Sequence, residues 1–122
     1  MNNVHLPHAL DSLDALWSQK VIGEANGTVL KVAKGTGRTN WHQHNDQDEV
    51  FVVYRGTLLV HTRTETIRLS EGDLLVVPRG TEHATEAPDK AHFLILGRDV
   101  TSTPDGGKPA WSATDPPPSS TA

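Results

Sequence analysis

Short runs of aliphatic and β-branched residues alternate with turn-forming residues from residue 20 onward. Runs of this length, bounded by Gly, Asn, Asp and Pro, are typical of β-strands. No long helical periodicity separates them, which favours an antiparallel sandwich or barrel over a fold of alternating strands and helices. The predicted strands are Thr28–Ala33, Asn40–His44, Val50–Tyr54, Thr57–Thr62, Thr66–Leu69, Leu74–Val77 and Ala91–Leu96.

The two ends of the chain depart from this pattern. Residues 1–19 predict an N-terminal arm in which Asp11–Trp17 forms a short helical turn. Residues 103–122 are rich in proline, glycine and serine and cannot bury enough apolar surface to offset their ordering entropy, so they predict a flexible tail. Between them, residues 20–102 predict a single all-β barrel.

The charge and composition of the chain exclude several classes of function. The formal charge is -4 over 122 residues and no basic run is present, so nucleic acid is not an expected partner. No apolar stretch is long enough to span a membrane, and Met1–Leu10 lacks a secretory pattern. The absence of cysteine excludes disulfides, thiolate ligands and a cysteine nucleophile. We expect a cytoplasmic protein that acts on a small molecule.

Histidine supplies the candidate chemistry. His42 and His44 are two positions apart, so on a strand their side chains project to the same side. The turn-forming segment Asn45–Asp48 can reset the phase and return Glu49 toward both imidazoles, whereas His83 needs a neighbouring strand to bring it there. Three imidazoles and one carboxylate suit a divalent transition-metal ion, and octahedral coordination would leave two positions open.

Each of these residues also has an ordinary explanation. A His-x-His pair is commonly a solvated coincidence, a glutamate at the start of a strand is commonly a solvated charge, and a single loop histidine needs no ligand. The combination with glycines and a proline at fixed offsets makes the metal hypothesis the stronger one.

These offsets form two motifs. The first comprises Gly37, His42, His44, Glu49 and Gly56, and the second comprises Gly72, Pro78, Gly80 and His83. On both motifs the chain resembles the cupin superfamily, over roughly residues 20–98. Two departures from the family pattern are present: the leading glycine is one position closer than usual, and Ala87 replaces the asparagine that closes the second motif.

The resemblance implies a double-stranded β-helix, or jelly-roll barrel, with one metal ion inside it near one mouth. The ion would be Zn, Fe, Mn or Ni, held by His42, His44, Glu49 and His83. The resemblance also implies a homodimer formed by sheet packing and strand exchange.

Three further residues are candidates for a substrate pocket. Phe51 shares the face of Glu49 by strand alternation. His92 lies on a predicted strand and is a candidate proton-transfer group. Arg98 is a candidate for binding a carboxylate or phosphate, because a guanidinium group can form two parallel hydrogen bonds to such an anion.

Three functions remain open at this point. The first is a metal-dependent enzyme, with Glu49 catalytic, that isomerises or moves a proton on a small polar metabolite, either sugar-like or with an enolisable carbonyl. The second is an Fe(II)-dependent dioxygenase, which would use the same ligands. The third is a non-catalytic small-molecule binding protein, a possibility that Ala87 keeps open.

Overall fold

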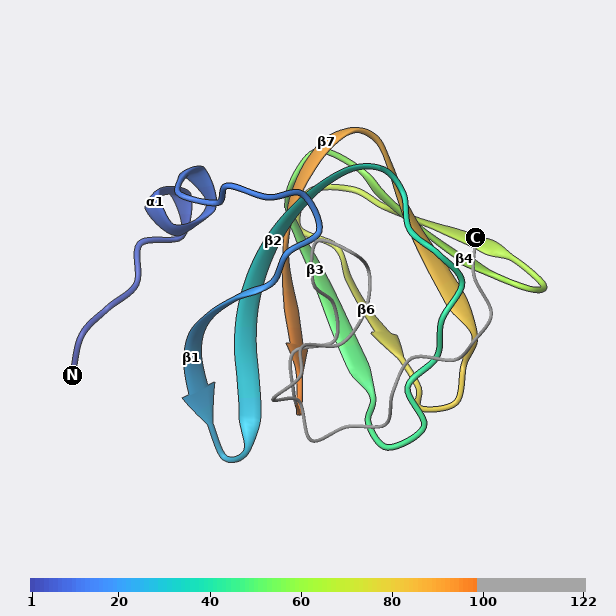
Figure 1. The fold of residues 1–122 in the computed structure, drawn as a ribbon, viewed down its shortest axis with the longest axis horizontal. Helices are drawn as coiled ribbons and strands as arrows, with labels where there is room; N and C mark the ends of the chain where they lie inside the picture. Colours follow the sequence, from blue (N-terminus) through green and yellow to red (C-terminus); the bar gives the residue numbers. More distant parts are fainter. Residues whose placement is uncertain (99–122) are drawn as a thin grey trace.

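The computed structural model describes residues 1–98, which form one short helix and seven antiparallel strands (Figure 1). The predicted tail, residues 103–122, lies outside the described residues. The elements are α1 (Leu6–Asp11), β1 (Lys20–Ala25), β2 (Thr28–Arg38), β3 (Glu49–Arg55), β4 (Leu58–Thr62), β5 (Thr66–Leu69), β6 (Leu74–Val77) and β7 (His83–Gly97).

The longest strand, β7, organises the barrel. It pairs with β2 along one edge, while its other edge pairs first with β4 and then with β3. The change of partner falls around Pro88, where β7 lacks a backbone donor and the register with β2 shifts between Gly35 and Gly37. The complete neighbour order is β1-β2-β7-β3-β6, with β5 attached through β4.

Two hydrophobic clusters stabilise this arrangement. The larger fills the barrel, where strand alternation directs Phe51, Val53, Phe93 and Ile95 inward among other buried aliphatic residues. The smaller lies outside the barrel, where Leu10 of α1 packs against Val32 of β2. The N-terminal residues expected to form an arm are therefore packed on the barrel through α1.

Most predicted strands are confirmed, with three differences. The strand β1 was missed, and Asn40–His44 is a loop in which His42 alone forms an isolated bridge. The final strand begins at His83, not Ala91, because β7 continues through Pro88.

The prediction of a helical turn at Asp11–Trp17 was wrong in position. The helix covers Leu6–Asp11, with Pro7 in its first turn, and ends at Ser12, whose hydroxyl donates to the carbonyl oxygen of Ala9. Proline is well tolerated in a first helical turn, because the amide that it lacks has no partner there. Within residues 1–98, no helix is long and apolar enough to cross a membrane.

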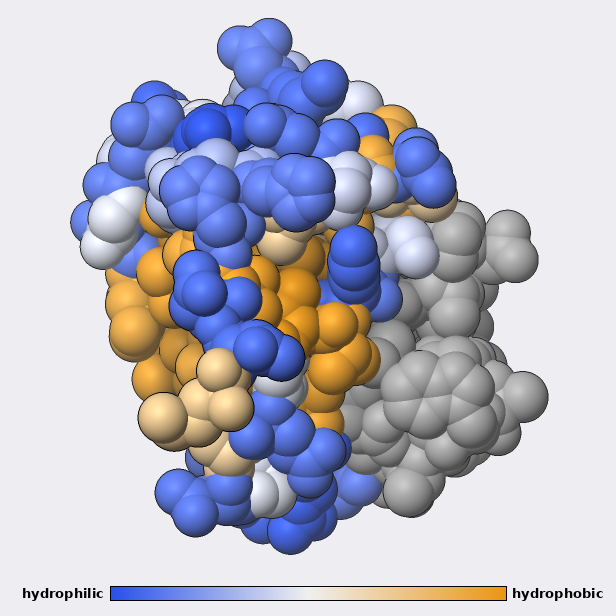
Figure 2. All heavy atoms as spheres, turned by 90° about the vertical axis from the view of Figure 1, so that its left-hand side faces the viewer, coloured by the Kyte–Doolittle hydropathy of each residue, from blue (hydrophilic) through white to orange (hydrophobic). Residues whose placement is uncertain are grey.

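The outer face of the sheet carries a second set of aliphatic side chains. Because of the strand register, Leu94 lies between Val32 on β2 and Val52 on β3, and Val52 pairs in turn with Leu74 on β6. Leu74 is 61% exposed and its β6 neighbour Val76 is 49% exposed. Figure 2 shows hydrophobic residues gathered between hydrophilic rims on the side of the molecule that carries α1 and β1.

Two turn glycines allow a matched test of how closely β7 approaches the turn between β3 and β4. Gly56 and Gly72 both have left-handed φ angles, 82° and 88°, but a Cβ on Gly56 would lie 2.6 Å from the carbonyl oxygen of Lys90, whereas a Cβ on Gly72 meets nothing within 4 Å. We expect Gly72→Ala to lower the free energy of unfolding by about 1 kcal/mol and Gly56→Ala by about 3 kcal/mol or more. Urea denaturation measures both, and equal losses would contradict the close approach of β7 to this turn.

Candidate metal centre

Four side chains converge near one end of β3 and β7. One nitrogen or carboxylate oxygen from each of His42, His44, Glu49 and His83 lies within 4.8 Å of the corresponding atom of the other three. Glu49, His44 and His83 are 2%, 4% and 1% exposed. The four residues singled out by the sequence are therefore brought together in the folded chain.

Backbone hydrogen bonds position the four side chains of this cluster. The amide of His42 donates to the carbonyl of His83 and the amide of His83 donates to the carbonyl of His42, both at 2.8 Å. The carbonyl of His44 accepts from the amide of Gly80 at 2.7 Å, and Gly80 has a φ of 80°. The loop that carries both histidines is thereby attached to the segment that leads into β7, while Glu49 is fixed as the first residue of β3.

Two of the imidazoles are oriented by carbonyl oxygens. His42 Nδ1 lies 2.8 Å from the Asn40 carbonyl oxygen, and His83 Nδ1 lies 2.8 Å from that of Thr81. A carbonyl oxygen can only accept, so each Nδ1 carries the proton and donates. The lone pair of the neutral ring is then on Nε2, the state that metal coordination requires. In His83 a bound ion would replace the proton that Nε2 shares with Glu49 Oε1 at 3.3 Å.

Glu49 lies between two imidazoles. Its Oε1 is 3.3 Å from His83 Nε2 and its Oε2 is 3.6 Å from His44 Nε2. Burial lowers the pKa of His83, but the hydrogen bond and the negative charge of Glu49 outweigh burial and raise that pKa overall. Burial, together with the nearby His83, lowers the pKa of His42.

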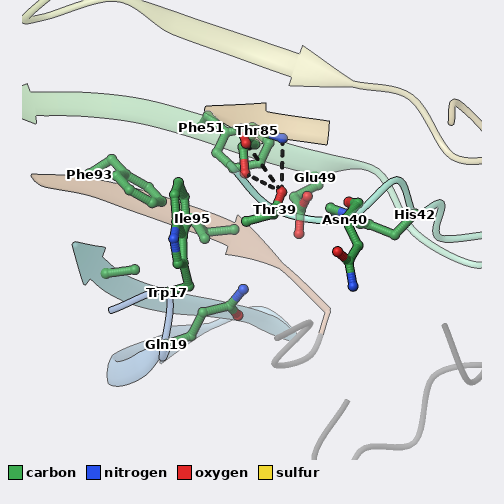
Figure 3. A pocket seen from close by; sticks show the side chains of 11 residues that line it. Trp17, Gln19, Thr39, Asn40, His42, Glu49, Phe51, Thr85, Phe93 and Ile95 are labelled. Atoms are coloured by element: carbon green, nitrogen blue, oxygen red, sulfur yellow. Dashed lines mark hydrogen bonds between the residues drawn. The ribbon is translucent and has the colours of Figure 1, made fainter. Parts of the chain in front are cut away.

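The cluster opens onto a small cavity in the barrel, with a volume of about 40 Å³. Two cluster members, His42 and Glu49, form part of its wall. Figure 3 shows them near Asn40, with Trp17 and Phe93 farther along the cavity. The complete lining is Trp17, Gln19, Ala33, Thr39, Asn40, His42, Glu49, Phe51, Thr85, Phe93 and Ile95.

One of the three expected pocket residues reaches this cavity. Phe51 lines it, as alternation from Glu49 predicted. His92 points to the opposite face of β7 from Phe93, and burial together with the charges of Arg55 and Lys90 lowers the pKa of His92. Arg98 is directed elsewhere, with its guanidinium donating to the Asp46 carbonyl at 3.0 Å.

Most residues that line the cavity were not predicted from the sequence. Phe93 and Ile95 could have been found, because strand alternation places them opposite His92 on β7. Trp17 and Thr39 lie outside regular elements or at their ends, so no periodicity marks them. Thr39 is bound to Thr85 by a 2.8 Å contact between the two hydroxyls.

The donor set fits a divalent transition-metal ion. Three imidazoles and a carboxylate are suitable ligands, and two of the rings are held with Nε2 available. Metal–ligand distances near 2.1 Å place neighbouring donor atoms about 3–4 Å apart. The two Glu49 oxygens lie 3.3 Å and 3.6 Å from the Nε2 atoms of His83 and His44, and all four donor atoms lie within 4.8 Å of one another.

A family model described as the cupin domain matches residues 28–97. The chain belongs to the cupin superfamily. This cupin is 40% identical over 67 residues to the uncharacterized protein YdbB of Bacillus subtilis (strain 168), a match that covers 54% of this chain and 59% of YdbB. It spans less than two thirds of the length of the curated relatives it matches.

Solved structures confirm the double-stranded β-helix fold. A cupin-2 domain containing protein from Shewanella frigidimarina superposes with a TM-score of 0.74 at 34% identity, covering 76% of this cupin and 91% of that chain. A Klebsiella pneumoniae protein with a double-stranded beta-helix domain gives a TM-score of 0.66 at 17% identity, covering 80% of this cupin and 89% of that chain.

The residue that replaces the motif asparagine, Ala87, is fully buried and pairs with Gly37 across β7 and β2.

Removal of one imidazole tests the centre. We expect the full chain to bind one divalent ion, and His83→Ala to weaken that binding by about 100-fold or more, because a ligand at the start of β7 is lost. Isothermal titration with Zn²⁺, Ni²⁺ and Mn²⁺, after dialysis against a chelator, measures the affinity.

The matched control is His61→Ala. His61 also lies on a strand, but its ring contacts Glu86 and Thr66 at 2.7 Å and takes no part in the cluster. This variant should retain one ion at unchanged affinity. Equal binding by wild-type protein and His83→Ala would contradict the assigned ligands.

Proposed function

We propose that this cupin is a metal-dependent enzyme that transfers a proton within a small molecule bearing an enolisable carbonyl, and thereby isomerises it. His42, His44, Glu49 and His83 are the proposed ligands of one divalent ion. The observation that carries the proposal is that His42 and Glu49 belong both to the cluster and to the cavity wall. A purely structural ion is usually enclosed by its ligands, without access to a cavity.

The bound ion would supply a Lewis acid that polarises a carbonyl oxygen. Glu49 is the proposed proton acceptor, since it lines the cavity and its carboxylate has two oxygens, of which one could bind the ion while the other takes up the proton. In an α-hydroxy carbonyl compound, Glu49 would remove the proton from the hydroxyl-bearing carbon and deliver it to the carbonyl carbon, while the hydroxyl proton passes to the original carbonyl oxygen, so that the carbonyl and hydroxyl groups exchange places. The buried surroundings limit competition from water at this carboxylate.

The polar groups in the cavity wall favour catalysis over storage of a ligand. A storage protein needs no proton-transfer group beside its ligand, whereas the carboxylate of Glu49 lines this cavity. Thr39 and Asn40 add a hydroxyl and an amide that can hydrogen-bond ligand oxygens.

An Fe(II)-dependent dioxygenase would use the same four metal ligands, and oxygen consumption distinguishes it from an isomerase. The homodimer expected from the family resemblance stays a prediction.

Deuterium exchange tests the proposed reaction. The probes are 2-hydroxyacetophenone and dihydroxyacetone, two ketones with a hydroxymethylene carbon beside the carbonyl. In D₂O, metal-loaded protein should catalyse loss of the hydroxymethylene proton signal, followed by one-dimensional NMR. We expect Glu49→Gln to slow exchange by about 100-fold or more, because the proton acceptor is lost.

The control is again His61→Ala, which should exchange at the wild-type rate. Metal content is measured for every variant, so that loss of the ion is separated from loss of the base. An exchange rate equal to that of metal-free protein for both probes would contradict the proposal. Oxygen consumption by the Fe(II)-loaded protein with the same probes would favour the dioxygenase instead.

A further inference from the structure

The cavity beside the cluster has two chemically different ends. In Figure 3, Asn40, His42 and Glu49 lie toward one end, and Trp17 and Phe93 lie toward the other. Among the described residues, no lysine or arginine lines the cavity. A carboxylate or phosphate placed near the aromatic end would lose its hydration without gaining a cationic partner.

Trp17 reaches the cavity through a conformation that bulky residues rarely adopt. Its φ is 62°, in the left-handed region, where a side chain meets the backbone unfavourably. The turn is fixed by two hydrogen bonds to β2: the Trp17 amide donates to the Lys34 carbonyl at 2.7 Å, and the indole Nε1 donates to the Thr36 carbonyl at 3.2 Å. Backbone strain of this kind persists only where surrounding contacts impose it.

Gly35 makes room for the indole ring. A Cβ on Gly35 would lie 2.5 Å from the ring of Trp17, so no larger residue fits there while Trp17 keeps its position. On its other side the indole ring contacts Phe93, with ring centroids 5.8 Å apart. The ring is therefore held between β2 and β7 as part of the cavity wall.

We infer that Trp17 is a specificity-determining residue and that it selects an uncharged ligand with a flat apolar body. The apolar body would lie against Trp17 and Phe93, and a polar end with one or two oxygens would reach His42 and Glu49. The inference rests on the proposed function, because it takes this cavity as the substrate site. Within that function it favours an aromatic or otherwise apolar carbonyl compound over a sugar.

Three probes with one shared end test this selection. Dihydroxyacetone, 2-hydroxyacetophenone and dihydroxyacetone phosphate all contain a hydroxymethyl ketone, and they differ in carrying a hydroxymethyl, a phenyl or a phosphate-bearing group. Isothermal titration of the Zn²⁺-loaded full chain compares their affinities. We expect the phenyl compound to bind about 10- to 100-fold more tightly than dihydroxyacetone, as burial of one aromatic ring predicts, and the phosphate to bind no better than dihydroxyacetone.

Two variants of the wall and one control accompany the titration. Trp17→Ala removes the indole and Gly35→Ala displaces it; each should lower the affinity for 2-hydroxyacetophenone by about 10-fold while leaving dihydroxyacetone unchanged. Trp41→Phe is the control, because the Trp41 ring is stacked on Arg63 at 3.9 Å and does not line the cavity. Thermal unfolding identifies any variant that fails to fold, and the comparison of probes on wild-type protein needs no variant.

The outcomes separate this inference from the proposed function. Equal affinities for the phenyl and hydroxymethyl compounds, or tightest binding of the phosphate, would overturn the inference even if deuterium exchange is observed. The inference would be supported if wild-type protein prefers the phenyl compound and both wall variants lose this preference. That result would hold even without deuterium exchange, since binding is measured without turnover. Retained preference in folded Trp17→Ala and Gly35→Ala would overturn the role of Trp17.

Discussion

The reciprocal pairing of His42 with His83 is the interaction on which the metal centre depends. Two backbone hydrogen bonds of 2.8 Å join a loop residue to the first residue of β7 and bring their ring centroids to 4.3 Å. The pair brings together two motifs that are about forty residues apart in the chain. The Gly80 contact then holds His44 beside this pair, and Glu49, at the start of β3, lies between the imidazoles of His44 and His83.

The same barrel that assembles the cluster also forms the cavity. Inward alternation along β3 places Glu49, Phe51 and Val53 on one side, so the strand that supplies a proposed ligand also supplies pocket wall and core. The partner strand β7 adds Phe93 and Ile95 in the same way. A wall residue and a core residue are thus neighbours on one strand face, and changes to the pocket are expected to affect stability.

Local signals explain what the sequence could predict. Glycine and proline spacing around Glu49 and His83 identified both motifs, and alternation placed Phe51 correctly. The strand β1 was missed because Val21 and Ile22 are its only consecutive aliphatic residues and four of its six residues are exposed. Asn26-Gly27, with φ angles of 53° and 78°, is nevertheless a strong hairpin signal that joins β1 to β2. Trp17 could not be predicted, because its position depends on contacts with Gly35 and Phe93 that are distant in the chain.

We propose that three imidazoles and one carboxylate hold one divalent ion. X-ray absorption spectroscopy at the zinc edge, on the full chain loaded with one equivalent of Zn²⁺, tests this ligand set. We expect imidazole scattering from three nitrogen ligands at about 2.0–2.1 Å together with oxygen ligands at about 2.0–2.2 Å, and one fewer imidazole in His44→Ala. A first shell made only of oxygen, unchanged in that variant, would show that the imidazoles do not bind the ion.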